Sequence, residues 1–513
     1  MIQWDASTLA RLDRESGEPL YWQIRNRVRD LILSGDLPPG TRLPPERDMA
    51  ARLGVNRTTV SNAYRELGAD GLVEGHVGRG TTVCARPGAG RPGEEDLLPQ
   101  PLPWSEVFAA GGEQARDPLI RELVALCARE DVISLAAGVP APDLYPIERF
   151  ALATERVLRQ HGQVALQHCP TEGHLPFRET LAEVAARRGI AASAEHVLVL
   201  AGSQQGLDLV ARTLLEPGDA VVVEVPSYLG ALSAFRAAGA RLVGVPMDED
   251  GLRTDVLERV LARHRPRLIY TLPTFQNPSG RVMSLERRQS LLALAQRYQV
   301  PILEDDPYGE LYYGDPPPPP IKSLDRQGHV LYLSTFSKIL FPGIRLGWLA
   351  APRPVVDRLA AVKQYTDLHT NTLAQWALAE FIREGWLEEH VASLRREYPH
   401  RRQAMLAALR EQVPRGLRWN EPAGGFYLWC HLEEGLRAKE LLAEAAARGV
   451  VFVVGEAFHA DGGGQDAFRL NFTYHDEQGL REGIRRLAKG LGALMREGRE
   501  RRGVPQAAVR PIV

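Results

Sequence analysis

Between residues 19 and 83, apolar and polar positions follow the spacing of three short helices and a hairpin. The first helix has an apolar face formed by Leu20, Ile24, Val28 and Ile32. A Gly/Pro-rich segment over 35–40 ends it, and a second helix over 46–53 ends at Gly54. Asn56 is a preferred N-cap residue for a third helix, whose core face carries Val60, Tyr64 and Leu67. Two short helices joined at a glycine predict a helix-turn-helix, and alternation around the glycines of 72–83 predicts a wing.

From about residue 118, short apolar runs alternate with helical patterns, which predicts an α/β domain with a largely parallel sheet. The clearest strands are Val197–Ala201, Ala220–Glu224, Arg267–Thr271, Ile302–Glu304 and Val330–Leu333. Residues 86–117 are rich in Pro, Gly and acid, which predicts a flexible linker. We therefore expect four segments: a winged-helix DNA-binding domain over 1–85, the linker, a large domain over 118–498 and a disordered tail over 499–513.

Composition narrows the classes of function. The net charge of -2 with 25% charged residues gives no global field that favours nucleic acid, so any DNA site must be local. The four cysteines have no metal-ligand spacing, so we expect reduced thiols and no metal. The absence of a signal-peptide pattern and of a membrane-length apolar run predicts a cytoplasmic protein without a membrane segment.

Polar residues follow each predicted strand, and active residues of parallel sheets lie at these carboxyl ends. Gly202–Gly206 has the composition of an anion cradle, although many such turns are only helix caps. Tyr228 is either a stacking platform or a packing residue, and Asn277 is either a ligand or a turn former. The acids over 304–306 either cap a helix or take a cationic partner, because buried acids are costly unless paired.

Lys338 follows the last of these strands and is one of five lysines in the chain. Thr335 and Ser337 precede it and Arg345 follows. A desolvated lysine near another cation becomes a nucleophile toward aldehydes, whereas most lysines are only solvated surface charges. A reactive lysine, an anion cradle, an aromatic platform and a buried acid are together the parts of a pyridoxal 5'-phosphate (PLP) site.

The motifs Asn277-Pro-Ser-Gly280, Asp305-Asp-Pro-Tyr308 and Ser337-Lys338 with Arg345 resemble those of fold-type I aminotransferases, especially the kynurenine/2-aminoadipate branch. The resemblance spans about 132–485 and implies that Lys338 forms the internal aldimine and Asp305 pairs with the pyridine nitrogen. It implies that Asn277 and Tyr308 bind the phenolic oxygen and that Tyr228 stacks on the ring. The phosphate ligands it implies are Ser203, Gln204, Thr335, Ser337 and Arg345.

Arg469 is implied to bind the substrate carboxylate with a bidentate guanidinium, together with Asn277. Relatives carry a tyrosine that reaches the phosphate of the partner subunit, where this chain has His168. The resemblance also implies a homodimer, because the fold-type I active site lies at a subunit interface.

The opening turn of the third helix carries Arg57, Thr58 and Thr59, which suit phosphates and base edges, although surface arginines are common. The stretches 43–67 and 70–81 resemble the GntR winged-helix family. By motif position, the residues implied to contact an operator are Arg47, Arg57, Thr58, Thr59 and Gly78, and Arg79 lies where a backbone contact is expected.

A GntR winged helix, a linker and an aminotransferase-like domain in one chain resemble the MocR regulators. The leading hypothesis is a PLP-dependent transcription regulator that binds double-stranded DNA. It senses an amine, an amino acid or PLP through an aldimine at Lys338. The alternative is an active aminotransferase with an accessory DNA-binding module, because every residue needed for transamination is present. A third hypothesis, in which the large domain only dimerises, is disfavoured by the intact Lys338 and Asp305.

Overall fold

The computed structural model describes residue 12 and residues 19–76, 80–84, 132–413 and 416–503. The chain divides into two compact units, Met1–Val107 and Phe108–Val513. The linker predicted over 86–117 lies outside the described residues. Among the described helices, none is long and apolar enough to cross a membrane.

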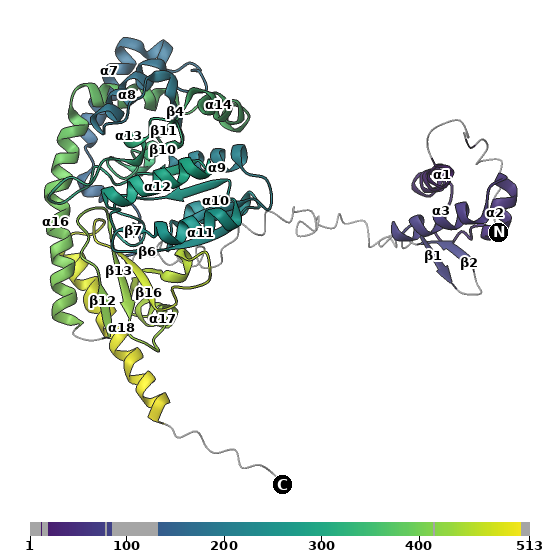
Figure 1. The fold of residues 1–513 in the computed structure, drawn as a ribbon. Coiled ribbons are helices and arrows are strands. Elements are labelled where there is room, and N and C mark those ends of the chain that lie inside the picture. Colours follow the sequence, from purple (N-terminus) through teal and green to yellow (C-terminus); the bar gives the residue numbers. More distant parts are fainter. Residues whose placement is uncertain (1–11, 13–18, 77–79, 85–131, 414–415, 504–513) are drawn as a thin grey trace, which may run out of the picture. The chain divides into compact units, whose positions relative to one another are not determined.

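The first unit is a winged helix-turn-helix, as the residue pattern predicted. Helices α1 (Leu20–Ser34), α2 (Glu46–Leu53) and α3 (Arg57–Ala69) precede an antiparallel hairpin of β1 (Val73–His76) and β2 (Gly80–Val83) (Figure 1). Ile24 and Val28 of the predicted α1 face are fully buried against Val60 and Leu67. Gly54 ends α2 in the left-handed conformation, which glycine adopts without a Cβ clash. The Asn56 side chain caps α3 by accepting from the Thr58 amide at 3.4 Å.

The second unit is built on an eight-stranded mixed sheet with the order β4-β11-β10-β9-β8-β5-β6-β7. Its strands are β4 (Val197–Leu200), β5 (Ala220–Val225), β6 (Arg241–Asp248), β7 (Gly251–Leu252), β8 (Leu268–Thr271), β9 (Ile302–Asp305), β10 (Val330–Thr335) and β11 (Gly347–Ala350). Strands β5, β6, β8, β9 and β10 are parallel, which confirms the predicted α/β class.

Helices cover both faces of this sheet because alternate strand residues point to opposite sides. On one face, Leu198 and Leu200 pack with residues of α9 (Ser203–Leu214), α10 (Leu229–Ala237) and α14 (Arg353–Asp367). On the other face, Val197 and Val199 pack with α8 (Leu175–Arg187) and α15 (Thr372–Arg383). The remaining helices around the sheet are α7 (Ile147–Ala165), α11 (Thr254–His264), α12 (Leu285–Tyr298) and the short α13 (Ile321–Leu324).

A smaller subdomain contains the antiparallel sheet β12-β13-β16-β15 and its own core. Its strands are β12 (Leu417–Trp419), β13 (Tyr427–Leu432), β15 (Val453–Val454) and β16 (Ala467–Asn471), and β14 (Val450–Val451) pairs with β3 (Ile133–Ser134). The long helix α16 (Trp386–Gln412) runs along one side of the unit from the large sheet to this subdomain (Figure 1). Helices α17 (Ala438–Ala446) and α18 (Glu477–Gly503) complete it.

Two expectations need correction. Helix α18 continues to Gly503, so the segment from 499 to 503, predicted as the start of a disordered tail, is helical. Glu and Arg are good helix formers, and the helix ends at a glycine two residues before Pro505. Strand β11 was not predicted. It runs antiparallel between β10 and β4, so it begins at the edge where the parallel strands end.

Candidate functional site

Lys338 lies just after β10 at the carboxyl edge of the parallel strands. Its Nζ donates a hydrogen bond to the carbonyl of Gly138 at 2.5 Å. Burial lowers the pKa of Lys338 below the usual lysine range. The structure therefore holds this amine away from solvent, in the environment that makes a lysine nucleophilic.

Asp305 is the last residue of β9 and is buried. Its Oδ2 accepts a hydrogen bond from the Tyr270 hydroxyl at 2.8 Å, whereas Oδ1 is buried without a partner in the described part of the chain. Burial raises the pKa of Asp305 to about 7. An unpartnered buried carboxylate oxygen is costly, so a cationic N–H donor is the group that fits beside Oδ1.

A cationic partner was expected for the acids over 304–306, and the structure places it beside Asp306. Asp306 Oδ2 accepts from Arg188 Nη2 at 2.8 Å and from the Tyr332 hydroxyl at 2.9 Å. Glu304 instead accepts from the amides of Ile321 and Lys322, each at 2.8 Å. Of the three acids, Glu304 binds the start of α13, Asp306 pairs with the guanidinium of Arg188, and Asp305 forms no ion pair with the described residues.

A narrow polar cradle forms where α9 begins. Gly202 has φ +87°, and a Cβ there would lie 2.5 Å from Arg345 Nη2. A Cβ on Gly347 would lie 2.9 Å from the Ser203 amide nitrogen, so glycine at both positions keeps the cradle open. Arg345 reaches it because β11 returns antiparallel, and its Nη2 donates to the Ala201 carbonyl at 2.9 Å.

The hydroxyls of Thr335 and Ser337 lie beside each other at the end of β10. Thr335 Oγ1 is 3.1 Å from Ser337 Oγ and accepts from the Ser337 amide at 3.2 Å. The Gln204 side chain contacts the next helix: its Nε2 donates to the Gly230 carbonyl at 3.0 Å and its Oε1 accepts from the Tyr228 hydroxyl at 3.4 Å. Gln204 thus fixes Tyr228, and the amides at the start of α9 with the hydroxyls of Thr335 and Ser337 are the groups that suit an anion.

Arg469 lies on β16, buried at the boundary between the large sheet and the small subdomain. It donates to Asn277 Oδ1 and to the Ala136 carbonyl, both at 2.9 Å, while its Nε is buried without a partner among the described residues. Its guanidinium lies 4.0 Å from the centre of the Tyr427 ring, and the Tyr427 hydroxyl accepts from Tyr308 at 3.1 Å. Asn277, Tyr308 and Arg469 are therefore linked into one polar group through Tyr427.

His168 lies apart from this group, exposed in the loop after α7. Its Nδ1 is 2.8 Å from Nε2 of His369, whose Nδ1 is 3.0 Å from the Thr370 carbonyl. Donation from His369 to that carbonyl leaves Nε2 as the acceptor, so His168 donates in the neutral pair. A phosphate contact across a dimer remains a prediction for His168.

Several residues of the site were not predicted from the sequence. Gly138, Tyr270 and Tyr427 carry no local signal, because each contacts the site from a distant part of the chain. Glu224 did carry a signal in the sequence, because it is an acid in an otherwise apolar, buried strand. It accepts from Thr271, from the Leu272 amide and from Gln276, whose Oε1 in turn accepts from Ser279. This network supports the turn that contains Asn277.

A second missed network supports the cradle. Lys363 Nζ donates to Asp367 at 2.7 Å, Asp367 accepts from Gln205 Nε2 at 2.8 Å, and Gln205 Oε1 accepts from the Ala201 amide at 2.8 Å. Lys363 is fully buried on the core-facing stripe of α14 with Val356 and Leu359. A lysine on an apolar helical stripe is the sequence signal that could have found it.

We expect Gln205→Leu to weaken phosphate binding, because it frees the Ala201 amide at the base of the cradle. The loss of about 1 kcal/mol corresponds to roughly a fivefold higher Kd for PLP. Titration followed by absorbance should show this change for PLP but not for pyridoxal, which lacks the phosphate. Asp208→Asn, at a half-exposed position of the same helix, is the control. An equal loss for both ligands would mean that Gln205 only stabilises the fold.

In the first unit, Arg47, Arg57 and Thr58 are exposed, and Thr59 is half-buried at the start of α3. Arg57 Nε donates to Glu46 at 3.1 Å, an exposed pair of the kind that contributes little to stability. The Arg57 guanidinium is therefore available to another anion at small cost. Gly78 and Arg79 lie outside the described residues.

Comparisons with known proteins match both units. Residues 20–83 match the family of bacterial regulatory proteins called gntR, and residues 130–487 match aminotransferase class I and II. YisV of Bacillus subtilis, named as an HTH-type transcriptional regulator, is 35% identical over 495 residues, which cover 96% of this chain and 99% of that protein. MocR of Rhizobium meliloti, named as a probable rhizopine catabolism regulatory protein, is 33% identical over 499 residues, covering 95% and 97%. The chain belongs to the MocR-type regulators of the GntR family.

The aminotransferase domain also matches solved structures. LysN, the α-aminoadipate aminotransferase of Thermus thermophilus, has a TM-score of 0.73 and 41% identity, covering 77% of this chain and 100% of that chain. Its structure contains N-(5'-phosphopyridoxyl)-L-leucine. The cofactor of this MocR-type domain is PLP. The residues fit it: Asp305 Oδ1 has no donor among the described residues, the Gly202 cradle has no room for a Cβ, and the Lys338 amine is desolvated.

Proposed function

We propose that this MocR-type chain is a transcription regulator that binds an operator through α2 and α3 and senses an amine, an amino acid or PLP at Lys338. One observation carries the proposal. The start of α3 is exposed, and in the same chain Lys338, Asp305 and Arg469 come together in a buried polar site. The GntR match and the regulators that align over nearly the whole chain support it.

PLP, when bound, supplies an aldehyde that condenses with amines and a ring that accepts electrons. The chain's own residues prepare this chemistry. Lys338 presents an amine whose pKa is lowered by burial, so a larger fraction is neutral and nucleophilic. Asp305 Oδ1 would hold a proton on the ring nitrogen, and that positive charge would in turn favour its carboxylate form. The Gly202 cradle would hold the phosphate.

Arg469 and Asn277 recognise the ligand. The buried guanidinium lies beside Asn277 Oδ1, and in the described part of the chain its Nε has no partner, which suits an α-carboxylate. For an amino acid to act as a signal, it must bind one arrangement of the chain more tightly than the other. We infer that this differential binding arises at Arg469, because an amine without a carboxylate leaves its Nε unpaired.

We also infer a cytosolic homodimer. Val164 and Leu166 of the α7 end are 60% and 67% exposed, and Leu368 beside His369 is 57% exposed. His168 and His369 are hydrogen-bonded, which places these apolar side chains on one surface. Exposed apolar side chains gathered on one surface are typical of an interface.

The decisive experiment mixes the PLP-loaded protein with its own upstream promoter DNA. We expect a specific complex whose affinity changes when an amino acid is added, by a factor between five and about a hundred, the usual range of allosteric coupling. Lack of a specific complex with that DNA would contradict the proposal.

The residues grouped around Lys338, together with Arg469, favour one alternative function, that of an active aminotransferase. This alternative predicts many turnovers with an amino acid and a 2-oxo acid, measured as 2-oxo acid formed per site. A single half-reaction per site is the result expected of a sensor.

A further inference from the structure

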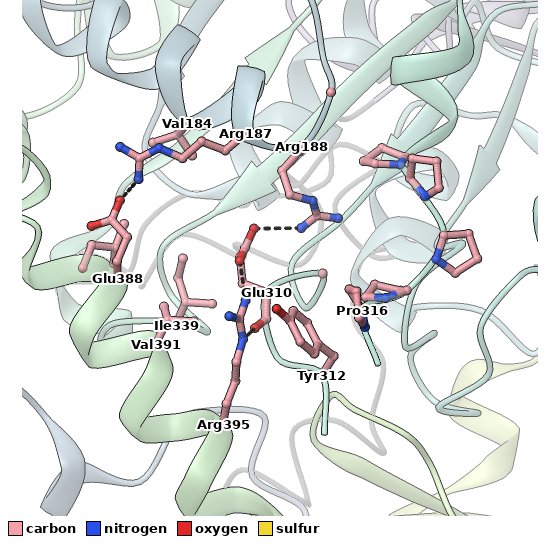
Figure 2. A pocket seen from close by; sticks show the side chains of 17 residues that line it. Val184, Arg187, Arg188, Glu310, Tyr312, Pro316, Ile339, Glu388, Val391 and Arg395 are labelled. Carbon is pink, nitrogen blue, oxygen red and sulfur yellow. Dashed lines mark hydrogen bonds and ion pairs between the residues drawn. The ribbon is translucent and has the colours of Figure 1, made fainter. Parts of the chain in front are cut away.

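A cavity of about 540 Å³ opens in the second unit between the end of α8, the loop over 309–320 and α16 (Figure 2). This volume lies within the range of small-molecule sites. The residues that line it include none of the predicted cofactor or substrate residues. Ile339 and Gly309 are lining residues, and each directly follows a residue of the cofactor site.

One wall of the cavity is rigid. It is formed by five consecutive prolines, Pro316–Pro320, whose rings fix φ. The buried Arg288 donates from Nη1 to the Pro319 carbonyl at 3.2 Å, and Glu304 binds the two amides that follow the run. A wall of prolines that is also held at its C-terminal end is already in its binding conformation, which lowers the entropy cost of binding.

The polar groups of the cavity are mostly donors. Glu310 lies between two guanidinium groups and accepts from Arg188 Nη1 at 3.1 Å and from Arg395 Nη2 at 2.6 Å, so both carboxylate oxygens are occupied (Figure 2). In the part of the chain that the structure describes, Arg395 Nη1 and Arg188 Nε have no acceptor. Arg187, paired with Glu388 at the mouth, adds further N–H groups. Unused donors favour an anion over an amine.

The apolar groups of the cavity favour an aromatic body. The Arg395 guanidinium lies 3.8 Å from the centre of the Tyr312 ring, and Val184, Ile339 and Val391 complete the lining with the prolines. A flat ring can pack on the proline wall while a carboxylate reaches Arg395.

The cavity is connected to the cofactor acids through Arg188. This arginine donates to Glu310 in the cavity and to Asp306 at 2.8 Å, directly after Asp305. A Cβ on Gly309 would lie 2.4 Å from its guanidinium, so the backbone of this loop is in close contact with Arg188. A ligand that draws Arg188 toward the cavity therefore acts on the loop that carries Asp305 and Tyr308.

We propose that this cavity is a second ligand site, for a small carboxylate with an aromatic body, and that its occupancy is transmitted to the cofactor through Arg188 and Asp306. Binding in the cavity does not depend on operator recognition, so it can be tested without DNA.

The test is calorimetric titration of the PLP-loaded full chain with 3-phenylpropanoate, an aromatic carboxylate that has no amine or keto group. We expect a binding event that persists in Arg469→Met. This variant lacks the arginine that is proposed to bind a carboxylate at the cofactor site. Arg395→Met should weaken this event roughly tenfold or more, the loss expected for a charge-assisted hydrogen bond. Val184→Trp, which fills the cavity without changing a charge, should abolish it.

Arg396→Met is the matched control, because Arg396 is exposed and adjacent on α16 but does not line the cavity. It should bind as the wild type does. Saturation of the cavity should also shift the absorbance of the bound cofactor in the Arg469→Met protein. Binding that is lost in Arg469→Met and kept in both cavity variants, or no binding at all, would overturn the proposal. Binding without an absorbance shift would overturn the coupling through Arg188.

Discussion

Lys338→Ala is expected to abolish the covalent attachment of PLP and its visible absorbance band. The Lys338 Nζ is the amine that the structure desolvates at the carboxyl edge of the sheet, whereas the amine of Lys363 is paired with Asp367. After borohydride treatment, the wild type should keep one cofactor per chain through denaturation, measured by mass spectrometry. The variant should keep none.

Lys439→Ala is the matched control for this experiment. Lys439 is about half exposed on α17 and pairs with Glu456, so its replacement should leave the cofactor attached. Cofactor that stays covalently bound in Lys338→Ala would show that another amine takes part. Noncovalent PLP should still bind to the variant, because the Gly202 cradle is intact.

Arg57→Ala is expected to weaken operator binding by roughly tenfold to a hundredfold, the cost of losing one base or phosphate contact from a recognition helix. The cofactor spectrum should not change, because Arg57 belongs to the first unit. A gel-shift or anisotropy titration at fixed salt measures the effect, and fixed salt matters because phosphate contacts are strongly screened.

Arg65→Ala provides the comparison on the same helix. Arg65 is exposed about two turns farther along α3, away from the end that faces a groove in this family of folds. It should bind the operator nearly as the wild type does. If Arg65→Ala is the weaker binder of the two, the start of α3 is not the recognition surface.

The residue pattern predicted most of the architecture because it is set by local periodicity. The three helices of the first unit, the parallel strands and the polar residues at their ends all follow from short-range spacing. The cap at Asn56 and the end of α2 at Gly54 are confirmed for the same reason, since both depend on the conformation of one or two residues.

Contacts between distant segments could not be predicted in this way. A cation was expected beside the acids of β9, but Asp305 is held by Tyr270, and the guanidinium of Arg188 serves Asp306. Tyr427 reaches Tyr308 from the small subdomain. The antiparallel β11 was missed because its four apolar residues do not differ in pattern from any buried segment.

The return of β11 has a consequence for how long the cofactor stays on the protein. Thr335 and Gly347 are paired across β10 and β11, so the loop between them is a closed hairpin with Lys338 near one end and Arg345 near the other. Release of Lys338 from a bound cofactor would leave the Arg345 end fixed, because β11 is paired on both sides. Exchange of one ligand for another would then not require loss of the cofactor, and one cofactor would serve for many ligand molecules during its residence time on the chain.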